Sequence, residues 1–183
     1  MNVKSPLKIY TLGVYGFTED EFFGALVDSE IDLFIDIRAR RGMRGARYKF
    51  VNSSYLQLKL KEMGIAYAHM KTLAPTPRIR GLQDRADHQQ RLARRSDRQH
   101  LCKEYVREYK RDVLRLYKRK PERKFHADAV LAEARELANY PDVQELKRPV
   151  LFCVEGEPRA CHRSLAADEM RRQLGVGIID IIA

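Results

Sequence analysis

The segment 153–163 gathers side chains that can take part in chemistry. It holds two of the three cysteines, one histidine, two glutamates and two arginines. The apolar run 149–152 before it is typical of a buried strand, and the stretch 164–174 after it is typical of a helix that ends at Gly175. The segment is therefore predicted to be a strand–loop–helix connection. So many nucleophiles, acids and bases on one loop indicate a functional site.

Cys161 and His162 are predicted to stand where the helix after this loop begins. The helix dipole, Arg159 and Arg163 would lower the pKa of a thiol there, so Cys161 is a candidate nucleophile or redox thiol, with His162 as a catalytic partner. Free cysteines are also common core residues. We favour that structural role for Cys153, which ends a buried strand, and leave both roles open for Cys161.

Cys153, Cys161 and His162 are also three potential zinc ligands. Their spacing does not follow a C-x-x-C pattern, and adjacent residues such as Cys161 and His162 seldom both reach one ion. We therefore predict no metal site and keep the three only as weak candidates. The sequence does not identify a cofactor.

Two carboxylates are candidate acid–base groups. Asp36 lies near the end of the apolar run 31–37, and Glu155 follows Cys153. Two carboxylates brought together by strand ends would raise the pKa of one of them, as acid–base chemistry requires. Alternatively, each could bind a metal ion or form a structural ion pair with Arg38 or Arg163.

An anion-binding site is predicted at the same place. Arg38, Arg163 and the N-terminus of the helix after the cysteine loop would together bind an anion such as phosphate. The turn that contains Gly13, Tyr15 and Gly16 is expected to help hold it.

The segment 153–159 also fits the C-x-x-G-x-x-R pattern of the phosphate loop in cysteine-dependent phosphatases. Two glutamates inside such a loop would repel the substrate. We retain phosphatase-like chemistry as a minor alternative.

Strands and helices alternate along the chain. Apolar runs predict strands at 7–12, 31–37, 65–69, 149–152 and 176–182. Start signals and amphipathic spacing predict helices from Thr18 to about Ser29, from Ser53 or Ser54 to Gly64, over 127–138 and over 164–174. Two prolines predict a loop over 73–81. From about Gln83 to Lys120 the composition is helical, with an apolar stripe only in the second half, and Pro121 ends this helix. The first half, 84–100, is predicted to be a lid or a disordered excursion.

This alternation predicts an α/β fold. We expect a single domain over residues 1–183, with a mostly parallel, Rossmann-like sheet of about five strands and helices on both faces. Ligands in such folds bind beyond the carboxyl ends of the strands, where the strand order reverses. Gly13, Asp36, His69 and Cys153 all stand at predicted strand ends, so we expect them at one edge of the sheet.

The net charge of +10 is concentrated in one segment. Residues 78–124 hold 17 basic and 7 acidic side chains, whereas the rest of the chain holds 18 of each sign. This segment is predicted to be a basic helical insert or lid. A local basic excess favours a polyanionic partner, and a solvated helical face that keeps the protein in solution is the alternative.

Several classes of protein are disfavoured. No apolar run approaches the roughly 20 residues of a membrane span. Residues 1–6 lack the apolar core of a signal peptide, and three cysteines agree with a reducing compartment. We expect a cytoplasmic protein with no membrane partner.

Five short motifs resemble the DUF 488 family, a domain of unknown function widespread in bacteria and archaea. In chain order they are Thr11-Leu12-Gly13, Asp36-Ile37-Arg38, Gly64-Ile65-Ala66-Tyr67-Ala68-His69, Cys153-Val154-Glu155 and Cys161-His162-Arg163. The resemblance spans nearly the whole chain except 78–124. It supports the fold and the site and implies no particular reaction.

The leading hypothesis is an enzyme-like domain that binds a phosphorylated small molecule, a nucleotide or nucleic acid, at the carboxyl edge of the sheet. Asp36 and Glu155 would do acid–base or metal work, while Arg38 and Arg163 hold the anion. The alternative is a non-catalytic nucleic-acid-binding module that uses the basic segment 78–124 and the loop 38–49. A further alternative is a thiol-based redox or phosphatase-like protein.

Overall fold

The computed structural model describes residues 7–115, 125–138 and 146–183 and contains one five-stranded, all-parallel sheet. The strand order is β3-β2-β4-β1-β5. The strands are β1 (Ile9–Gly13), β2 (Leu33–Asp36), β3 (Ala66–His69), β4 (Pro149–Cys153) and β5 (Ile178–Ile181). The predicted α/β class, parallel sheet and strand number are confirmed, and the arrangement is consistent with a Rossmann-like fold.

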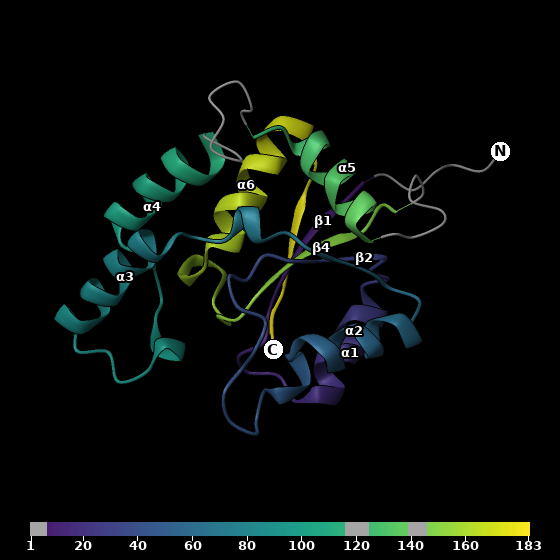
Figure 1. The fold of residues 1–183 in the computed structure, drawn as a ribbon, viewed down its shortest axis with the longest axis horizontal. Coiled ribbons are helices and arrows are strands. Elements are labelled where there is room, and N and C mark those ends of the chain that lie inside the picture. Colours follow the sequence, from purple (N-terminus) through teal and green to yellow (C-terminus); the bar gives the residue numbers. More distant parts are fainter. Residues whose placement is uncertain (1–6, 116–124, 139–145) are drawn as a thin grey trace.

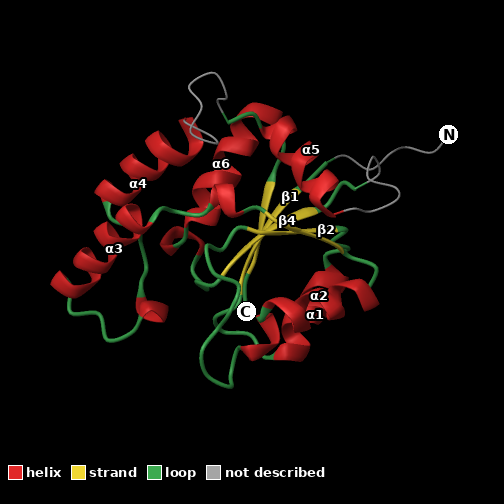
Figure 2. Ribbon diagram, viewed as in Figure 1, coloured by secondary structure: helices red, strands yellow, loops and turns green. Residues whose placement is uncertain are grey.

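Helices cover both faces of the sheet, as Figures 1 and 2 show. They are α1 (Glu19–Asp28), α2 (Ser53–Glu62), α3 (Pro77–Gln89), α4 (Lys103–Tyr109), α5 (Ala127–Ala138) and α6 (His162–Leu174). Helices α1 and α2 lie on one face, and α5 and α6 on the other. Helices α3 and α4 pack against each other at one side of the molecule, and a π-helical segment, Lys110–Arg115, continues α4.

Two apolar cores lie on the two faces because successive strand residues point to opposite sides. Phe34 of β2 and Phe152 of β4 pack with Phe22 of α1 on one side. Ile35, which follows Phe34, and Leu151, which precedes Phe152, belong to the core under α5 and α6. Strands buried on both faces need the nearly continuous apolar runs that the sequence shows.

Helix starts follow the local sequence, with two corrections. Thr18 caps α1 and forms the predicted capping box with Glu21. The N-cap of α2 is Asn52, one residue before the predicted serines. The predicted loop over 73–81 was wrong in its second half, because Thr76 caps α3 and Pro77 occupies its first turn. A helix needs no proline N–H there, and the fixed φ of proline suits the position.

The segment over which the sequence predicts helical composition, about 83–120, is divided in the structure. Helix α3 ends at Gln89, and residues 90–102 are irregular except for a short 3-10 turn at Arg95–Asp97. Arg98, which is only 7% exposed, is the buried residue of this stretch, and most of its neighbours there are exposed. The predicted helix end at Pro121 lies outside the described residues.

No helix among the described residues is both long enough and apolar enough to cross a membrane.

Candidate active site

A cavity of about 500 Å³ lies at the carboxyl edge of the sheet. Cys153 and Glu155 after β4, Arg38 after β2 and Tyr15 after β1 contribute to its lining. Residues of α3, Tyr105 of α4 and the first residue of α6 complete it. Strand pairing aligns Gly13 with Cys153 and Asp36 with His69, which confirms that these strand ends share one edge. Of the predicted residues, Arg38, Cys153, Glu155, Cys161 and His162 line the cavity, whereas Gly13, Asp36, His69 and Arg163 are not among its described lining residues.

The cysteine loop and the turn after β1 are locked together by close backbone contact. A Cβ atom on Gly13 would lie 1.8 Å from the carbonyl oxygen of Glu155, and one on Gly156 would lie 2.7 Å from that of Tyr15. Only glycine permits such an approach. The amides of Val14 and Tyr15 both donate to the carbonyl of Val154, at 3.2 and 3.1 Å. These contacts fix the path of the loop that carries Glu155.

The side chain of Arg163 also fixes the position of this loop. It is completely buried and donates from Nη1 to the carbonyl of Glu155, from Nη2 to that of Gly156 at 2.8 Å, and from Nε to Thr11 Oγ1 at 3.3 Å. All three of its nitrogens therefore have protein partners. Its contacts favour a positioning role over the direct anion contact that the sequence indicated.

The backbone amides of the turn after β1 also have hydrogen-bond partners within the protein. In addition to the amides of Val14 and Tyr15, the amide of Gly16 donates to Tyr48 Oη at 3.3 Å. Tyr15 contributes its side chain to the cavity instead, and burial raises the pKa of its hydroxyl. The phenol therefore stays protonated at neutral pH and can donate a hydrogen bond to a ligand.

Cys153, Cys161 and His162 form a buried cluster in the cavity wall. Both sulfur atoms lie 3.9 Å from His162 Nδ1. Burial acts to raise the pKa of Cys161, but a hydrogen bond from Cys153 and the charges of His162 and Arg163 hold that pKa well below its usual value. The contact with Cys161 and burial raise the pKa of Cys153.

Glu155 is the buried acid of the site. Glu155 is 9% exposed, and its Oε1 lies 3.1 Å from Nη1 of Arg98. Desolvation and the negative charge of Cys161 raise its pKa to about 7, against the opposing charges of Arg98 and His162. A carboxyl group with this pKa can both take up and release a proton at neutral pH.

Arg98 was not predicted as a site residue. It bridges Glu155 and Asp87 of α3, which accepts from Nε at 3.2 Å and also from Nη2. No local pattern distinguishes it from the other arginines of the segment 78–124, because its partner Glu155 lies 57 residues away. Through its contact with Glu155, Arg98 links the irregular stretch 90–102 to the active-site loop.

Asp36 and Arg38 form a buried bidentate ion pair. Nε and Nη2 of Arg38 lie 2.9 and 2.7 Å from the two carboxylate oxygens, and Tyr67 donates to the same carboxylate at 3.0 Å. Nη2 also donates to the carbonyl of Val51, and the guanidinium lies 4.7 Å from the Phe152 ring centre. Arg38 lines the cavity, whereas Asp36 is not among the described residues that do. Asp36 therefore orients Arg38, and Glu155 has a separate environment.

One family profile, described as "Domain of unknown function DUF488", matches residues 18–170. The chain belongs to the DUF488 family. This confirms the resemblance seen in the motifs, and the match contains Asp36, Arg38, Cys153, Glu155 and the Cys161-His162-Arg163 run. No curated protein and no solved structure matches the chain.

The cavity mouth of this DUF488 domain is rich in arginine. Arg40, Arg80 and Arg95 line it together with the buried Arg38. Arg95 forms an ion pair with Asp84 at 2.9 Å. Nη1 of Arg38 is buried and has no hydrogen-bond partner within the described parts of the chain. This wall is suited to an anionic ligand.

Arg159, which the phosphatase-like pattern requires in a phosphate cradle, is exposed. It is absent from the lining of the cavity as far as the structure describes it. Its amide donates to Glu157 and its carbonyl accepts from Leu101. In this DUF488 domain the loop 153–159 therefore contributes Cys153 and Glu155, and not Arg159, to the described lining of the cavity.

Proposed function

We propose that this domain is an enzyme that binds a phosphorylated ligand in the cavity and exchanges a proton with it through Glu155. The observation that carries the proposal is the position of the Glu155 carboxyl group. It is buried in the cavity wall, between Arg98 on one side and the thiol–imidazole cluster on the other. Burying a carboxyl group costs free energy, so its place beside a cavity favours a chemical role.

The surrounding residues support this assignment. A pKa near 7 suits a general acid or base. The sulfur of Cys161 and the imidazole of His162 provide a nucleophile or a ligand set next to it. Arginines bind phosphate through paired N–H groups, and five line the cavity: Arg38, Arg40, Arg80, Arg95 and Arg98.

The predicted roles are revised accordingly. Glu155 acts as the acid–base residue, and Cys161 and His162 act beside it. Arg38 contacts the anion, with Asp36 as its positioning residue. Gly13, Gly16 and Arg163 set the backbone path of the site, and Tyr15 faces the ligand.

The test compares Glu155→Gln with Glu157→Gln. Glu157 lies in the same loop but caps a 3-10 turn instead of lining the cavity. Turnover is measured by ¹H and ³¹P NMR against nucleoside monophosphates, nucleoside diphosphates and 5′-phosphorylated oligonucleotides. We expect Glu155→Gln to lower turnover by about 100-fold or more, since a missing acid–base group typically costs that much. Glu157→Gln should retain it. Equal activity of the two variants would remove Glu155 from the mechanism.

A non-catalytic nucleic-acid-binding function is the second candidate. It is supported by the loop 38–49, which carries six basic and no acidic residues and exposes Arg40, Arg44, Arg47 and Lys49. Affinity for oligonucleotides would then fall steeply with salt and would not change in Glu155→Gln. A thiol-based redox function would instead show rapid alkylation of Cys161 at neutral pH.

A further inference from the structure

The two sulfur atoms and the imidazole nitrogen of the buried cluster are spaced like the ligands of one metal ion. The ligand atoms of Cys153, Cys161 and His162 all lie within 4.8 Å of one another, and each sulfur is 3.9 Å from Nδ1. Tetrahedral zinc, with bonds of about 2.3 Å to sulfur and 2.0–2.1 Å to nitrogen, requires a sulfur–nitrogen separation of about 3.6 Å. A shift of a few tenths of an ångström, of the order that a side-chain rotation supplies, brings the three into coordination.

The backbone explains how neighbouring residues can share one ion. Cys161 is the N-cap of α6 and has an extended conformation, with φ −133° and ψ 144°. His162 is the first residue of the helix. The change from extended to helical backbone between them turns the two side chains toward the same point. This removes the objection that adjacent residues seldom coordinate together.

The hydrogen bond of His162 selects the tautomer that a metal needs. Nε2 lies 3.2 Å from the carbonyl oxygen of Ile37. A carbonyl oxygen can only accept, so Nε2 carries a hydrogen, and in the neutral ring the lone pair of Nδ1 faces the two sulfurs. Histidines that bind metals usually donate their second N–H in this way, which fixes the ring and increases its basicity.

The cluster is largely enclosed by protein and lies in the wall of the cavity. Cys153 is 5% exposed, Cys161 2% and His162 6%, and all three line the cavity. Three protein ligands leave one position of a tetrahedron open, which is the pattern of catalytic rather than structural zinc. Two thiolates would neutralise the charge of a divalent ion, which lowers the electrostatic cost of burying it here.

We propose that Cys153, Cys161 and His162 bind a divalent metal ion, with zinc as the species that two sulfur ligands and one imidazole favour, and with a fourth position open to the cavity. Metal binding stands on the geometry of the cluster alone. Its use rests on the proposed function: a water molecule on the ion would attack the phosphorus of the bound ligand, the bond from phosphorus to the leaving oxygen would break, and that oxygen would take up the proton of the water.

The first experiment measures metal in untagged, full-length protein by inductively coupled plasma mass spectrometry. We expect about one zinc per chain in the wild type and a loss of most of it in Cys153→Ser and Cys161→Ser. Cys102→Ser is the matched control. Cys102 caps α4 through its sulfur, and serine is a good N-cap, so this variant should keep both fold and metal. Wild-type protein without metal, which also fails to take up added Zn²⁺ or Co²⁺, would overturn the site.

A second measurement uses only the wild-type chain, in case the serine variants do not fold. Added Zn²⁺ should protect Cys153 and Cys161 from alkylation while Cys102 reacts as before, and Co²⁺ should show sulfur-to-metal charge-transfer absorption. Equal labelling of all three cysteines with and without Zn²⁺ would count against the site.

The failure of one proposal can be told from the failure of the other. Glu155→Gln should abolish turnover and keep the metal, because Glu155 is not a ligand. Full metal content without any turnover on the panel would leave the metal site and remove the proposed function. Turnover that depends on Glu155 in protein without metal would do the reverse.

Discussion

Single glycines decide whether the active-site loop can form. At Gly13 the strand β1 passes so close to the carbonyl of Glu155 that no side chain fits between them. The atom that a substituent would meet is a backbone atom, and Nη1 of Arg163, which donates to that carbonyl, would lie only 3.0 Å from the added Cβ. The loop therefore cannot move aside without losing contacts of a completely buried arginine. Glycine is required here for space.

We predict that Gly13→Ala lowers the free energy of unfolding by about 3 kcal/mol or more, because overpacking against fixed backbone usually costs about 1–3 kcal/mol and this contact is tighter than most. Gly24→Ala is the control. Gly24 lies within α1 and an added Cβ meets nothing within 4 Å, so alanine should stabilise the protein by about 1 kcal/mol. Urea denaturation measures both. A Gly13→Ala protein as stable as the wild type would show that the loop can shift.

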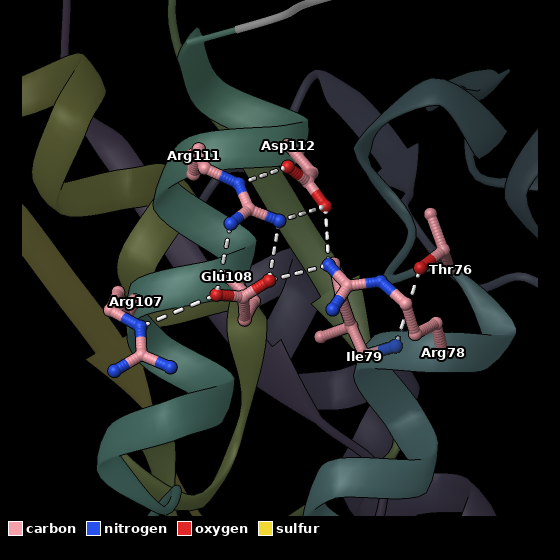
Figure 3. A network of polar contacts seen from close by, with 7 residues as sticks. All are labelled: Thr76, Arg78, Ile79, Arg107, Glu108, Arg111 and Asp112. Carbon is pink, nitrogen blue, oxygen red and sulfur yellow. Dashed lines mark hydrogen bonds and ion pairs between the residues drawn. The ribbon is translucent and has the colours of Figure 1, made fainter.

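The pairing of α3 with α4 forms one wall of the cavity. Figure 3 shows Glu108 and Asp112 between Arg78 of α3 and two further arginines, Arg107 of α4 and Arg111 of the π-helical segment. Glu108 accepts from Arg78 at 2.6 Å and from Arg107 at 3.3 Å, and Asp112 accepts from Arg78 at 2.6 Å. Part of the basic excess of the segment 78–124 is therefore used to join two helices.

The network predicts an acid-sensitive contribution to stability. The hydrogen bond from Arg78 is the main cause that holds the pKa of Glu108 below its usual value. A lowered pKa means that the contribution is complete above the unfolded-state pKa of about 4.3 and is lost as the pH falls through the folded-state value. Glu108→Gln should thus be less stable than the wild type at pH 7, and the difference should shrink in acid.

Thermal unfolding from pH 7 to pH 3 measures this difference. Glu104→Gln, an exposed position on the same helix, removes the same charge and should follow the wild type at every pH. A difference between wild type and Glu108→Gln that is constant with pH would mean that the ionised carboxylate contributes nothing.

Strands and most helix limits could be predicted from the sequence because their signals are local. Continuous apolar runs marked the buried strands, and a capping box marked the start of α1. Pro77 was misread because proline both interrupts and begins helices, and the choice depends on the N-cap Thr76. The approach of Arg98 to Glu155 could not be predicted, since it depends on how the irregular stretch 90–102 folds back.

The candidate site shows the same division at the scale of the whole molecule. Topology brings the ends of β1, β2 and β4 to one edge, so the presence of Gly13, Arg38 and Cys153 at one place was predictable. Which side chains face the cavity was not, because Asp36 and Arg163 found partners inside the protein. Side-chain direction depends on packing that no spacing rule encodes.

The net charge of +10 raises the question of whether the overall field or the cavity binds anions. A general field attracts any polyanion and depends on total charge, whereas a built site depends on where each charge lies. Arg80 and Arg85 separate the two cases. Both belong to α3, but only Arg80 lines the cavity, and Arg85 is exposed. Replacing either by glutamine changes the net charge equally.

We predict that Arg80→Gln weakens binding of pyrophosphate, used as a probe of the phosphate subsite, by about tenfold or more, because a hydrogen bond to a charged group contributes about 1.5–3 kcal/mol. Arg85→Gln should change the affinity by less than about twofold, since an exposed charge outside the cavity is largely screened at physiological salt. Isothermal titration calorimetry at two salt concentrations measures both. An equal loss in the two variants that vanishes at high salt would assign anion binding to the overall charge, and would favour a nucleic-acid-binding surface over an active site.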